Sequence, residues 1–361
     1  MKVVIIGAGP VGCYAGYLFA KSGYEVSIYE NHPQIGLPIQ CTGILTSDFD
    51  QLGFPLDYFL VNTIKRIEVC SPHEKLLINQ KNYIVSRPNF DNFFADMARK
   101  AGANIFLSRN FISKEGDVLI IKNAQNKNEI KVTADIVIAA DGPLSPTAKA
   151  YGFYHPEREN YLGVQAIVKG KFESDLIQTH FGRDICPGLF AWVVPESSTA
   201  ARVGLGAKKG SRKYFEKFIK EHNFKIKEMQ AGTIPLFHPQ QKLQKDNCYV
   251  LGDAAGFVKA TTLGGLIPGL RQAEILVDSL ANKKNYLREL KPLVRRLKLH
   301  LFIRKMFDKF TDGDFDQFVK YANQLKVKKV LEKYTREDPL QILIKTVLKE
   351  PRFLRFIKYL F

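Results

Sequence analysis

Three glycines near the N-terminus have the spacing of a loop that binds the phosphates of a dinucleotide. Gly7, Gly9 and Gly12 follow an apolar, β-branched run, and the residues after them have helical periodicity up to Gly23. In such a turn the first glycine allows a tight bend, the second lets a pyrophosphate approach the backbone, and the third lets helix and strand pack closely. The helix N-terminus then offers N–H groups and the positive end of its dipole to the phosphates.

An acidic residue follows at the spacing that ribose recognition requires. Glu30 ends the next strand-like segment, 18 residues after Gly12. Its carboxylate is therefore placed to accept hydrogen bonds from ribose hydroxyls. A glycine-rich turn without a ligand is the alternative, and the strand–turn–helix context disfavours it. We predict a dinucleotide site.

The elements that must position these residues follow from hydrophobic periodicity. Continuous apolar runs predict buried strands, and 3.6-residue spacing before a glycine predicts helices. Alternating segments predict antiparallel strands in a second layer. The expected buried strands are residues 2–6, 25–30, 135–141 and 247–253, and the expected helices are residues 11–22, 89–102 and 264–280.

The order of these elements predicts an α/β protein (α+β overall) in which one domain is inserted into another. A discontinuous Rossmann-like nucleotide-binding domain takes residues 1–60, 86–150 and 241–282. An antiparallel-sheet substrate domain takes residues 61–85 and 151–240, and a basic helical C-terminal segment takes residues 283–361.

Composition excludes several classes of protein. The 361 residues are 45% hydrophobic and 25% charged, which is ordinary for a globular chain and excludes a disordered or collagenous one. No apolar run approaches the ~20 residues of a membrane span, and the N-terminus lacks the features of a signal peptide. Five cysteines without a Cys-x-x-Cys pair argue against a disulfide framework and a metal site. We therefore expect a cytoplasmic protein with reduced thiols.

The net charge of +17 is concentrated at the C-terminal end. Residues 283–361 contain 21 Lys and Arg against 9 Asp and Glu, with Leu, Ile and Phe at helical spacings between them. Such helices either rest peripherally on an anionic membrane, here the inner face of the cell membrane, or pack their apolar faces on the protein. Nucleic-acid binding is disfavoured, because no recognised module accompanies the charge.

Further motifs identify the dinucleotide. The segments Arg87-Pro-Asn-Phe-Asp91, Asp141-Gly142 and Leu251-Gly-Asp-Ala-Ala-Gly256 follow the glycine turn in the order found in the FAD flavoproteins that include the aromatic hydroxylases, and they resemble that superfamily's motifs. The resemblance implies FAD as the cofactor. By this alignment the residues that line FAD, besides the three glycines, are Val11, Glu30, Cys41, Thr42, Ile44, Arg87, Phe111, Asp253, Gly265 and Leu266.

A tryptophan-containing segment narrows the family. Pro187-Gly-Leu-Phe190-Ala-Trp192-Val-Val-Pro195 holds the only Trp of the chain and resembles a motif of the geranylgeranyl reductase family. The loop around Cys41 and the run Gly252–Thr262 are also similar to that family. Phe190, Trp192 and Pro195 are therefore expected to line the substrate site. The alternative for this segment is an aromatic strand that only packs a sheet.

The resemblance implies FAD-dependent reduction of isolated C=C bonds in geranylgeranyl chains of archaeal membrane-lipid precursors. The electron donor would be ferredoxin or NAD(P)H, and the proton donor either Cys41 or a water held by the flavin. Two alternatives remain open: a monooxygenase or halogenase on the same fold, and a prenyl-lipid-binding flavoprotein without catalysis. The halogenase pattern Trp-x-Trp-x-Ile-Pro differs from Phe190-x-Trp192-x-Val194-Pro195, which counts against that class.

Overall fold

The computed structural model describes residues 1–360, and they divide into two compact units. Unit one comprises Met1–Ile39, Arg87–Glu159 and Ile234–Leu297. Unit two comprises Gln40–Ser86, Asn160–Thr233 and Lys298–Phe361. Each unit is therefore built from three separate segments, and the chain passes between the units several times.

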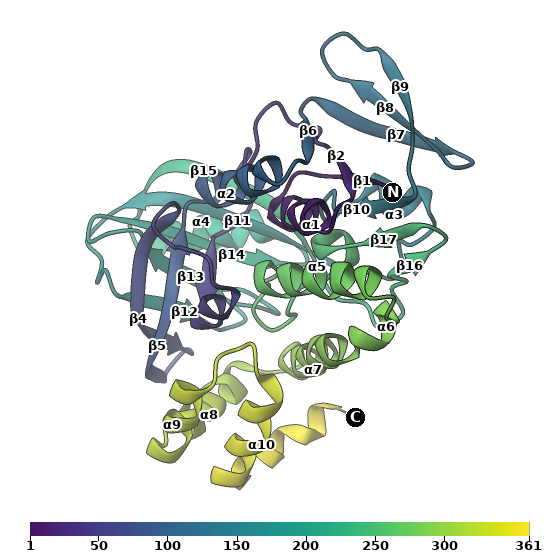
Figure 1. The fold of residues 1–361 in the computed structure, drawn as a ribbon. Coiled ribbons are helices and arrows are strands. Elements are labelled where there is room, and N and C mark those ends of the chain that lie inside the picture. Colours follow the sequence, from purple (N-terminus) through teal and green to yellow (C-terminus); the bar gives the residue numbers. More distant parts are fainter. Residues whose placement is uncertain (361) are drawn as a thin grey trace. The chain divides into compact units, whose positions relative to one another are not determined.

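Unit one is built on a six-stranded sheet with the order β16-β17-β10-β1-β2-β6 (Figure 1). All neighbours are parallel except β16 and β17, and Val3 to Ile6 of β1 are fully buried, as expected of a central parallel strand. The strands are β1 (Lys2–Ile6), β2 (Glu25–Tyr29), β6 (Asn104–Phe106), β10 (Ile136–Ala139), β16 (Gln244–Lys245) and β17 (Cys248–Val250).

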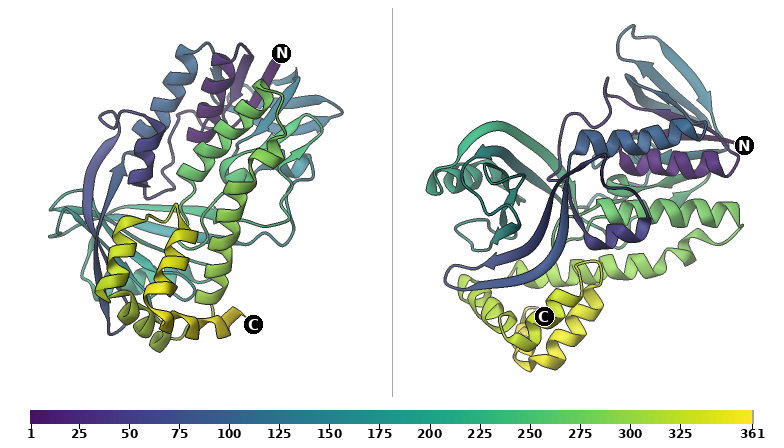
Figure 2. Two further views of the ribbon diagram at one scale, coloured as in Figure 1. Left: turned by 60° about the horizontal axis from the view of Figure 1, so that its bottom comes forward. Right: turned by 60° about the vertical axis from the view of Figure 1, so that its left-hand side comes forward.

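Three long helices pack together beside this sheet. α1 (Pro10–Lys21) lies against both α2 (Arg87–Lys100) and α5 (Leu266–Ala281) (Figure 2). A separate three-stranded antiparallel sheet consists of β7 (Arg109–Glu115), β8 (Val118–Asn123) and β9 (Glu129–Thr133). The shorter elements of the unit are α3 (Pro146–Ala150), the 3₁₀ turn η2 (Gly252–Ala255) and α6 (Tyr286–Glu289).

Unit two is built on an eight-stranded sheet with the order β15-β11-β14-β13-β12-β4-β5-β3. The pairs from β11 to β12 and from β4 to β3 are antiparallel, whereas β12 and β4 run parallel. The strands are β3 (Ile44–Thr46), β4 (Leu60–Cys70), β5 (Lys75–Val85), β11 (Asn160–Lys169), β12 (Leu176–His180), β13 (Ala191–Pro195), β14 (Ala200–Ala207) and β15 (Lys225–Pro235).

Helices complete unit two. α4 (Ser211–Glu221) lies within the segment for which alternation predicted only strands, and it buries Phe215, Phe218 and Ile219 at helical spacing. α7 (Lys291–Phe307) crosses from unit one into unit two. The remaining elements are η1 (Ser47–Leu52), α8 (Asp312–Ala322), α9 (Leu325–Lys333), α10 (Pro339–Lys349) and η3 (Pro351–Leu360).

The observed division differs from the expected boundaries in several places. Residues 151–159 and 234–240, expected in the substrate domain, and residues 283–297, expected in the C-terminal segment, belong to unit one. Residues 40–60 belong to unit two, because β3 adds to the edge of its sheet beside β5. The C-terminal segment does not stand apart as a third unit. Phe310, Phe315 and Val327 share one buried cluster with Ile67 and Ile78 of the sheet, so residues 298–360 are part of unit two. The predicted fold class, a Rossmann-like domain with a second sheet and C-terminal helices, is confirmed.

Candidate functional site

The glycine turn after β1 has the shape that a pyrophosphate requires. Gly7 has φ +106°, and a Cβ added there would lie 2.3 Å from the Ala140 carbonyl oxygen. A Cβ on Gly12 would lie 2.1 Å from the oxygen of Gly7. Gly9 is different, because it is extended, no atom lies within 4 Å of an added Cβ, and no side chain caps α1. The open space at an uncapped helix N-terminus fits an anionic phosphate group.

Glu30 holds the glycine turn and faces it. Its side chain is buried, and Oε2 accepts a hydrogen bond from the Ala8 N–H at 2.7 Å. Oε1 accepts the His32 N–H at 3.0 Å and lies 2.6 Å from His32 Nδ1. A carboxylate offers about four acceptor positions, so Glu30 retains capacity for a ribose hydroxyl. His32 was not predicted from the sequence and lies beside the same carboxylate.

Arg87 and Asp91 form a buried ion pair in the first turns of α2. Nε and Nη2 of Arg87 donate to the two carboxylate oxygens of Asp91, each at 2.9 Å, and Asp91 is only 4% exposed. Burial raises the pKa of Asp91, and the Arg87 charge opposes that shift. Burial also raises the pKa of Asp253, and the Arg87 charge opposes that shift as well, which places these two predicted residues in one electrostatic environment.

Asp253 lies at the N-terminus of α5. A Cβ added to Gly265, the residue before that helix, would lie 2.8 Å from Asp253 Oδ1, and no side chain caps α5. Burial raises the pKa of Asp253. Val11 packs on η2, the turn that carries Asp253, since a Cβ added to Gly252 would lie 3.3 Å from Val11 Cγ2. Leu263, three residues before α5 begins, adopts a left-handed backbone with φ +57°.

Arg158 is a buried residue of this site that the sequence did not reveal. Its guanidinium donates to the backbone oxygens of Ala254 at 2.7 Å and Asp253 at 3.2 Å, and also to that of Pro143. Burial lowers the pKa of Arg158. These contacts tie the turn that carries Asp253 to the loop after β10. Arg158 is thus a positioning residue, and no motif surrounds it.

Two further predicted residues of unit one occupy defined positions. Phe111 is buried in β7, two residues after Arg109, whose N–H donates to the Glu30 carbonyl oxygen at 2.7 Å. Leu266 is the first residue of α5. Unit one therefore brings the glycine turn, Glu30 and β7 together at one end of the sheet, and Arg87 together with Asp253.

In unit two, the loop around Cys41 is held tightly by Arg202. The guanidinium of Arg202, which is 7% exposed, donates from Nη1 to the backbone oxygens of Thr42 and Val85. Gly43 has φ +70°, and an added Cβ would lie 2.9 Å from that nitrogen. Cys41 Sγ accepts the Gly43 N–H at 3.3 Å. The loop conformation therefore depends on glycine and on a buried arginine.

The tryptophan strand presents an aromatic face. Phe190 lies 5.2 Å from the Phe181 ring and 6.2 Å from the Trp192 ring, measured between centroids. Gly204 of β14 leaves room for Trp192, because an added Cβ would lie 2.7 Å from Cζ2. Pro195 is an odd number of residues from Trp192, so it lies on the opposite face of the strand. The structure does not group Pro195 with the two aromatic residues.

Gln165 joins the Cys41 loop to the tryptophan strand, and no sequence motif surrounds it. Its Oε1 accepts from Thr42 Oγ1 at 2.8 Å and from Trp192 Nε1 at 3.4 Å. Its Nε2 donates to Gln230 Oε1 at 2.6 Å. Ile44 and Trp192 both pack on one buried apolar cluster, which consists of Ile64, Ile84, Ile177 and Val194. Unit two therefore brings Thr42, Ile44 and Trp192 together.

Comparison with known proteins identifies the family. Residues 5–58 match the NAD(P)-binding Rossmann-like domain. Over 350 residues the chain is 30% identical to digeranylgeranylglycerophospholipid reductase 2 of Methanothermobacter thermautotrophicus, an alignment that covers 88% of this chain and 90% of the relative. The chain belongs to the digeranylgeranylglycerophospholipid reductase family. The resemblance found in the sequence is confirmed.

Solved structures support the fold of this family member. A geranylgeranyl bacteriochlorophyll reductase-like protein of Thermoplasma acidophilum superposes with a TM-score of 0.86, with 20% identity and coverage of 100% of this chain and 99% of that one. A flavin-dependent brominase superposes with a TM-score of 0.72, with 14% identity and coverage of 99% and 100%. At these identities the superpositions show a shared fold alone.

One group of metal-type side chains stands out among residues 1–360. His155, Glu157 and His238 of unit one bring one candidate ligand atom each within 4.8 Å of one another, and the two imidazole rings stack at 3.7 Å. Each Nδ1 accepts a backbone N–H, from Glu157 and from Gln240, at 3.3 Å. When Nδ1 of a neutral imidazole accepts a hydrogen bond, Nε2 carries the ring proton, so neither ring offers a free lone pair and we assign no metal here. Every helix within residues 1–360 is too short or too polar to span a bilayer.

Proposed function

We propose that this family member is an FAD-dependent reductase that saturates isolated C=C bonds in the geranylgeranyl chains of membrane-lipid precursors. The observation that carries the proposal is the 30% identity with a relative of that name over 88% of the chain. The site agrees with it in two ways. Unit one has an open, uncapped glycine turn for a dinucleotide, and unit two has an aromatic and aliphatic surface around Trp192.

The residues of unit one would hold FAD by its charged and polar parts. Gly9 and the N-terminus of α1 would bind the pyrophosphate, and Glu30 a ribose hydroxyl. By the resemblance to the flavoprotein superfamily, Asp253 would contact the ribityl–phosphate chain, and the N-terminus of α5 the flavin pyrimidine. Bound and reduced, FAD supplies a hydride equivalent to one alkene carbon. The positive end of the α5 dipole favours the negative charge of a reduced flavin.

The residues of unit two would bind and orient the prenyl chain. An isolated alkene has no carbonyl for the protein to polarise, so correct placement of the reacting carbons must contribute much of the rate. Phe190 and Trp192 give an apolar wall on which a polyprenyl chain can lie while water is excluded, and Val194 is buried in the cluster behind Trp192. The second alkene carbon needs a proton. Cys41 or a water held in the loop around it would supply that proton.

The proposed partners are a prenylated lipid and an electron donor, either ferredoxin or NAD(P)H. The sequence contains one glycine-rich nucleotide turn, which favours a protein donor. We place the enzyme in the cytoplasm, peripherally at the inner face of the cell membrane, because its substrate is a membrane lipid.

An anaerobic turnover experiment tests the function. Purified protein loaded with FAD and reduced with dithionite is incubated with detergent-dispersed digeranylgeranylglycerol phospholipid, and the lipid is analysed by mass spectrometry. We expect products that are each heavier by one H₂ and that require the protein. Unchanged lipid from folded, flavin-loaded protein would rule out this substrate. Turnover only with oxygen would indicate a monooxygenase or halogenase instead.

Two further arms of the experiment address the electrons and the proton. Reduced ferredoxin and NAD(P)H replace dithionite in turn, and the donor that sustains more than one turnover is the physiological class. The Cys41→Ser variant is compared with the wild type under single-turnover conditions. A rate within about tenfold of the wild type assigns the proton to water, since a lost acid catalyst typically costs 10²- to 10⁴-fold.

A further inference from the structure

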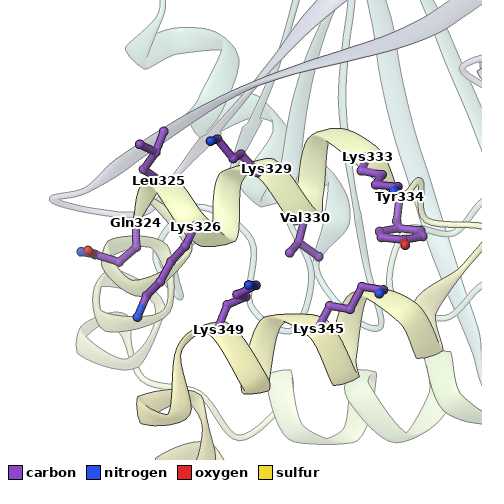
Figure 3. Close-up of a pocket in the computed structure, with 9 residues that line it drawn as sticks. All are labelled: Gln324, Leu325, Lys326, Lys329, Val330, Lys333, Tyr334, Lys345 and Lys349. Atoms are coloured by element: carbon purple, nitrogen blue, oxygen red, sulfur yellow. The ribbon is translucent and has the colours of Figure 1, made fainter.

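Five lysines from two neighbouring helices line one groove at the C-terminal end of unit two. α9 and α10 lie side by side and run in opposite directions (Figure 3). The groove between them has a volume of about 640 Å³. It is lined by Lys326, Lys329, Lys333, Lys345 and Lys349, and we call this the lysine groove.

Acidic groups do not neutralise the lysine groove. No Asp or Glu lines it in the described chain, and only Lys326 has a carboxylate within ion-pair distance there, that of Glu350 at 3.5 Å. Lys333 and Lys345 lie over the same ring, that of Tyr334, at 5.7 and 5.5 Å from its centroid. Like charges that line one groove repel one another in the free protein, and an anionic ligand relieves that repulsion.

α10 also exposes a row of large apolar side chains. Leu340, Ile344 and Leu348 follow one another at four-residue spacing along α10 and are 53%, 47% and 74% exposed. We call them the apolar ridge. The opposite side of α10 is already used, because Pro339 and Thr346 are buried there. Val347 lies at the border between that side and the ridge, and it packs on the core cluster of unit two. α10 is thus held on unit two by its packed side, and the apolar ridge lies on a different side of the same helix.

The two features adjoin each other. Lys345 and Lys349 each come one residue after a member of the ridge, Ile344 and Leu348, which is about 100° further around the helix. An exposed apolar stripe bordered by lysines is the pattern of a helix that lies in the plane of a membrane interface. From Gln324 to the end of the chain there are ten Lys and Arg against four Asp and Glu, so the surrounding charge has the same sign.

We infer that the lysine groove and the apolar ridge together form the face by which this protein docks on an anionic bilayer. The lysines bind headgroup phosphates, and the ridge enters the boundary between headgroups and acyl chains. Nucleic acid would leave the apolar ridge unused. A second copy paired through the same face would bring two lysine grooves against each other. The inference rests on the proposed function for the reason to visit a membrane, but its test needs no turnover.

Vesicle binding of the flavin-loaded full chain tests the inference. Sedimentation is compared between vesicles of phosphatidylcholine alone and vesicles with about 30% phosphatidylglycerol. We expect binding only to the anionic vesicles, weakening strongly as salt rises from about 0.1 to 0.5 M. Equal binding to both compositions, or none to either, overturns the inference without any variant.

Matched variants localise the face. The charge variant replaces four groove lysines with glutamine: Lys329, Lys333, Lys345 and Lys349. Its control removes the same charge elsewhere in unit two, at four exposed lysines: Lys213, Lys217, Lys220 and Lys225. Each lysine near an anionic leaflet contributes about fivefold, so four additive contributions amount to about 600-fold, and the charge variant should bind anionic vesicles at least about 50-fold more weakly. An equal loss in the control would reduce the effect to net charge and refute a specific face.

The ridge is tested by Ile344→Ser with Leu348→Ser, against Ile226→Ser, another exposed apolar residue of unit two. We expect about tenfold weaker binding for the ridge variant alone. If that variant instead converts a dimer to a monomer, a second copy covers the face, and the inference is wrong. The two proposals can fail separately. If the wild-type protein docks on vesicles but does not reduce dispersed lipid, only the proposed function is contradicted. If it reduces dispersed lipid but does not dock on vesicles, only the docking face is contradicted.

Discussion

The pair of Arg87 and Asp91 allows a sharp test of how unit one holds its cofactor-binding end. Both guanidinium–carboxylate bonds are 2.9 Å long, and Asp91 is 4% exposed. Replacing Arg87 with Met keeps most of the side-chain volume and leaves a buried carboxylate without its counter-charge. Breaking a buried ion pair from one side costs about 3–5 kcal/mol. That is a large part of the ~5–15 kcal/mol that stabilises a typical protein.

The cost should depend on pH in a defined direction. Burial already raises the pKa of Asp91, and the loss of Arg87 raises it further. Near pH 4 the carboxyl is largely protonated in the folded variant, so the penalty for burying a charge is small. The penalty grows as pH rises toward the raised pKa of the folded state, because unfolding then releases a proton. Arg87→Met should therefore be closest to the wild type near pH 4 and furthest from it at pH 7.

Urea denaturation of the apoprotein, followed by circular dichroism at pH 4.5 and 7, measures both effects. Arg99→Met on the same helix is the control, since its partner Asp96 is exposed and a surface pair contributes at most about 1 kcal/mol. Adding Asp91→Leu to Arg87→Met should restore most of the stability, because no unpaired charge remains. FAD affinity should stay reduced in that double variant. A loss below about 1 kcal/mol for the single variant, or no recovery in the double variant, would refute the reasoning.

Three further outcomes follow from the same geometry. Gly9→Ala should leave the apoprotein's stability within about 0.5 kcal/mol, because its Cβ meets no atom within 4 Å, yet weaken FAD binding at least tenfold in a fluorescence titration. Gly43→Ala, where a Cβ would lie 2.7 Å from a backbone oxygen, should lower the melting temperature far more than Gly53→Ala, where only the left-handed backbone opposes the change. Burial lowers the pKa of His180 to about 4. As pH decreases, the unfolded state therefore takes up the proton before the folded state does, and the free energy of unfolding decreases. Between pH 6.5 and 5 the wild type should lose roughly 1–2 kcal/mol more than His180→Asn, and equal pH profiles would contradict that assignment.

The sequence predicted those parts of the site whose chemistry depends on neighbours in the chain. The spacing of Gly7, Gly9 and Gly12 after an apolar strand follows from backbone sterics within one turn, so it could be read without the fold. Glu30 could be placed for the same reason, since a strand's length sets its distance from the turn. The motif around Asp253 likewise combines a strand, a turn and a helix that are close in sequence.

Only the tertiary structure revealed the residues whose partners are distant in the chain. Arg158 binds the backbone of Asp253 across 95 residues, Gln165 binds Thr42 across 123, and Arg202 binds the Thr42 carbonyl across 160. A single arginine or glutamine in a strand or loop has no local pattern that distinguishes it from a surface residue. Its role arises when folding buries it beside backbone oxygens that need donors.

The C-terminal segment shows the same limit. Its composition predicted basic amphipathic helices, because charge and periodicity are properties of the chain itself. Which apolar side chains are buried was decided by packing. Val347 joins the core cluster with Phe310 and Ile67, whereas Leu340 and Leu348, on the same helix, remain exposed beside lysines. Periodicity shows that a helix has an apolar face, but only the position of the sheet and the neighbouring helices decides how much of that face is covered.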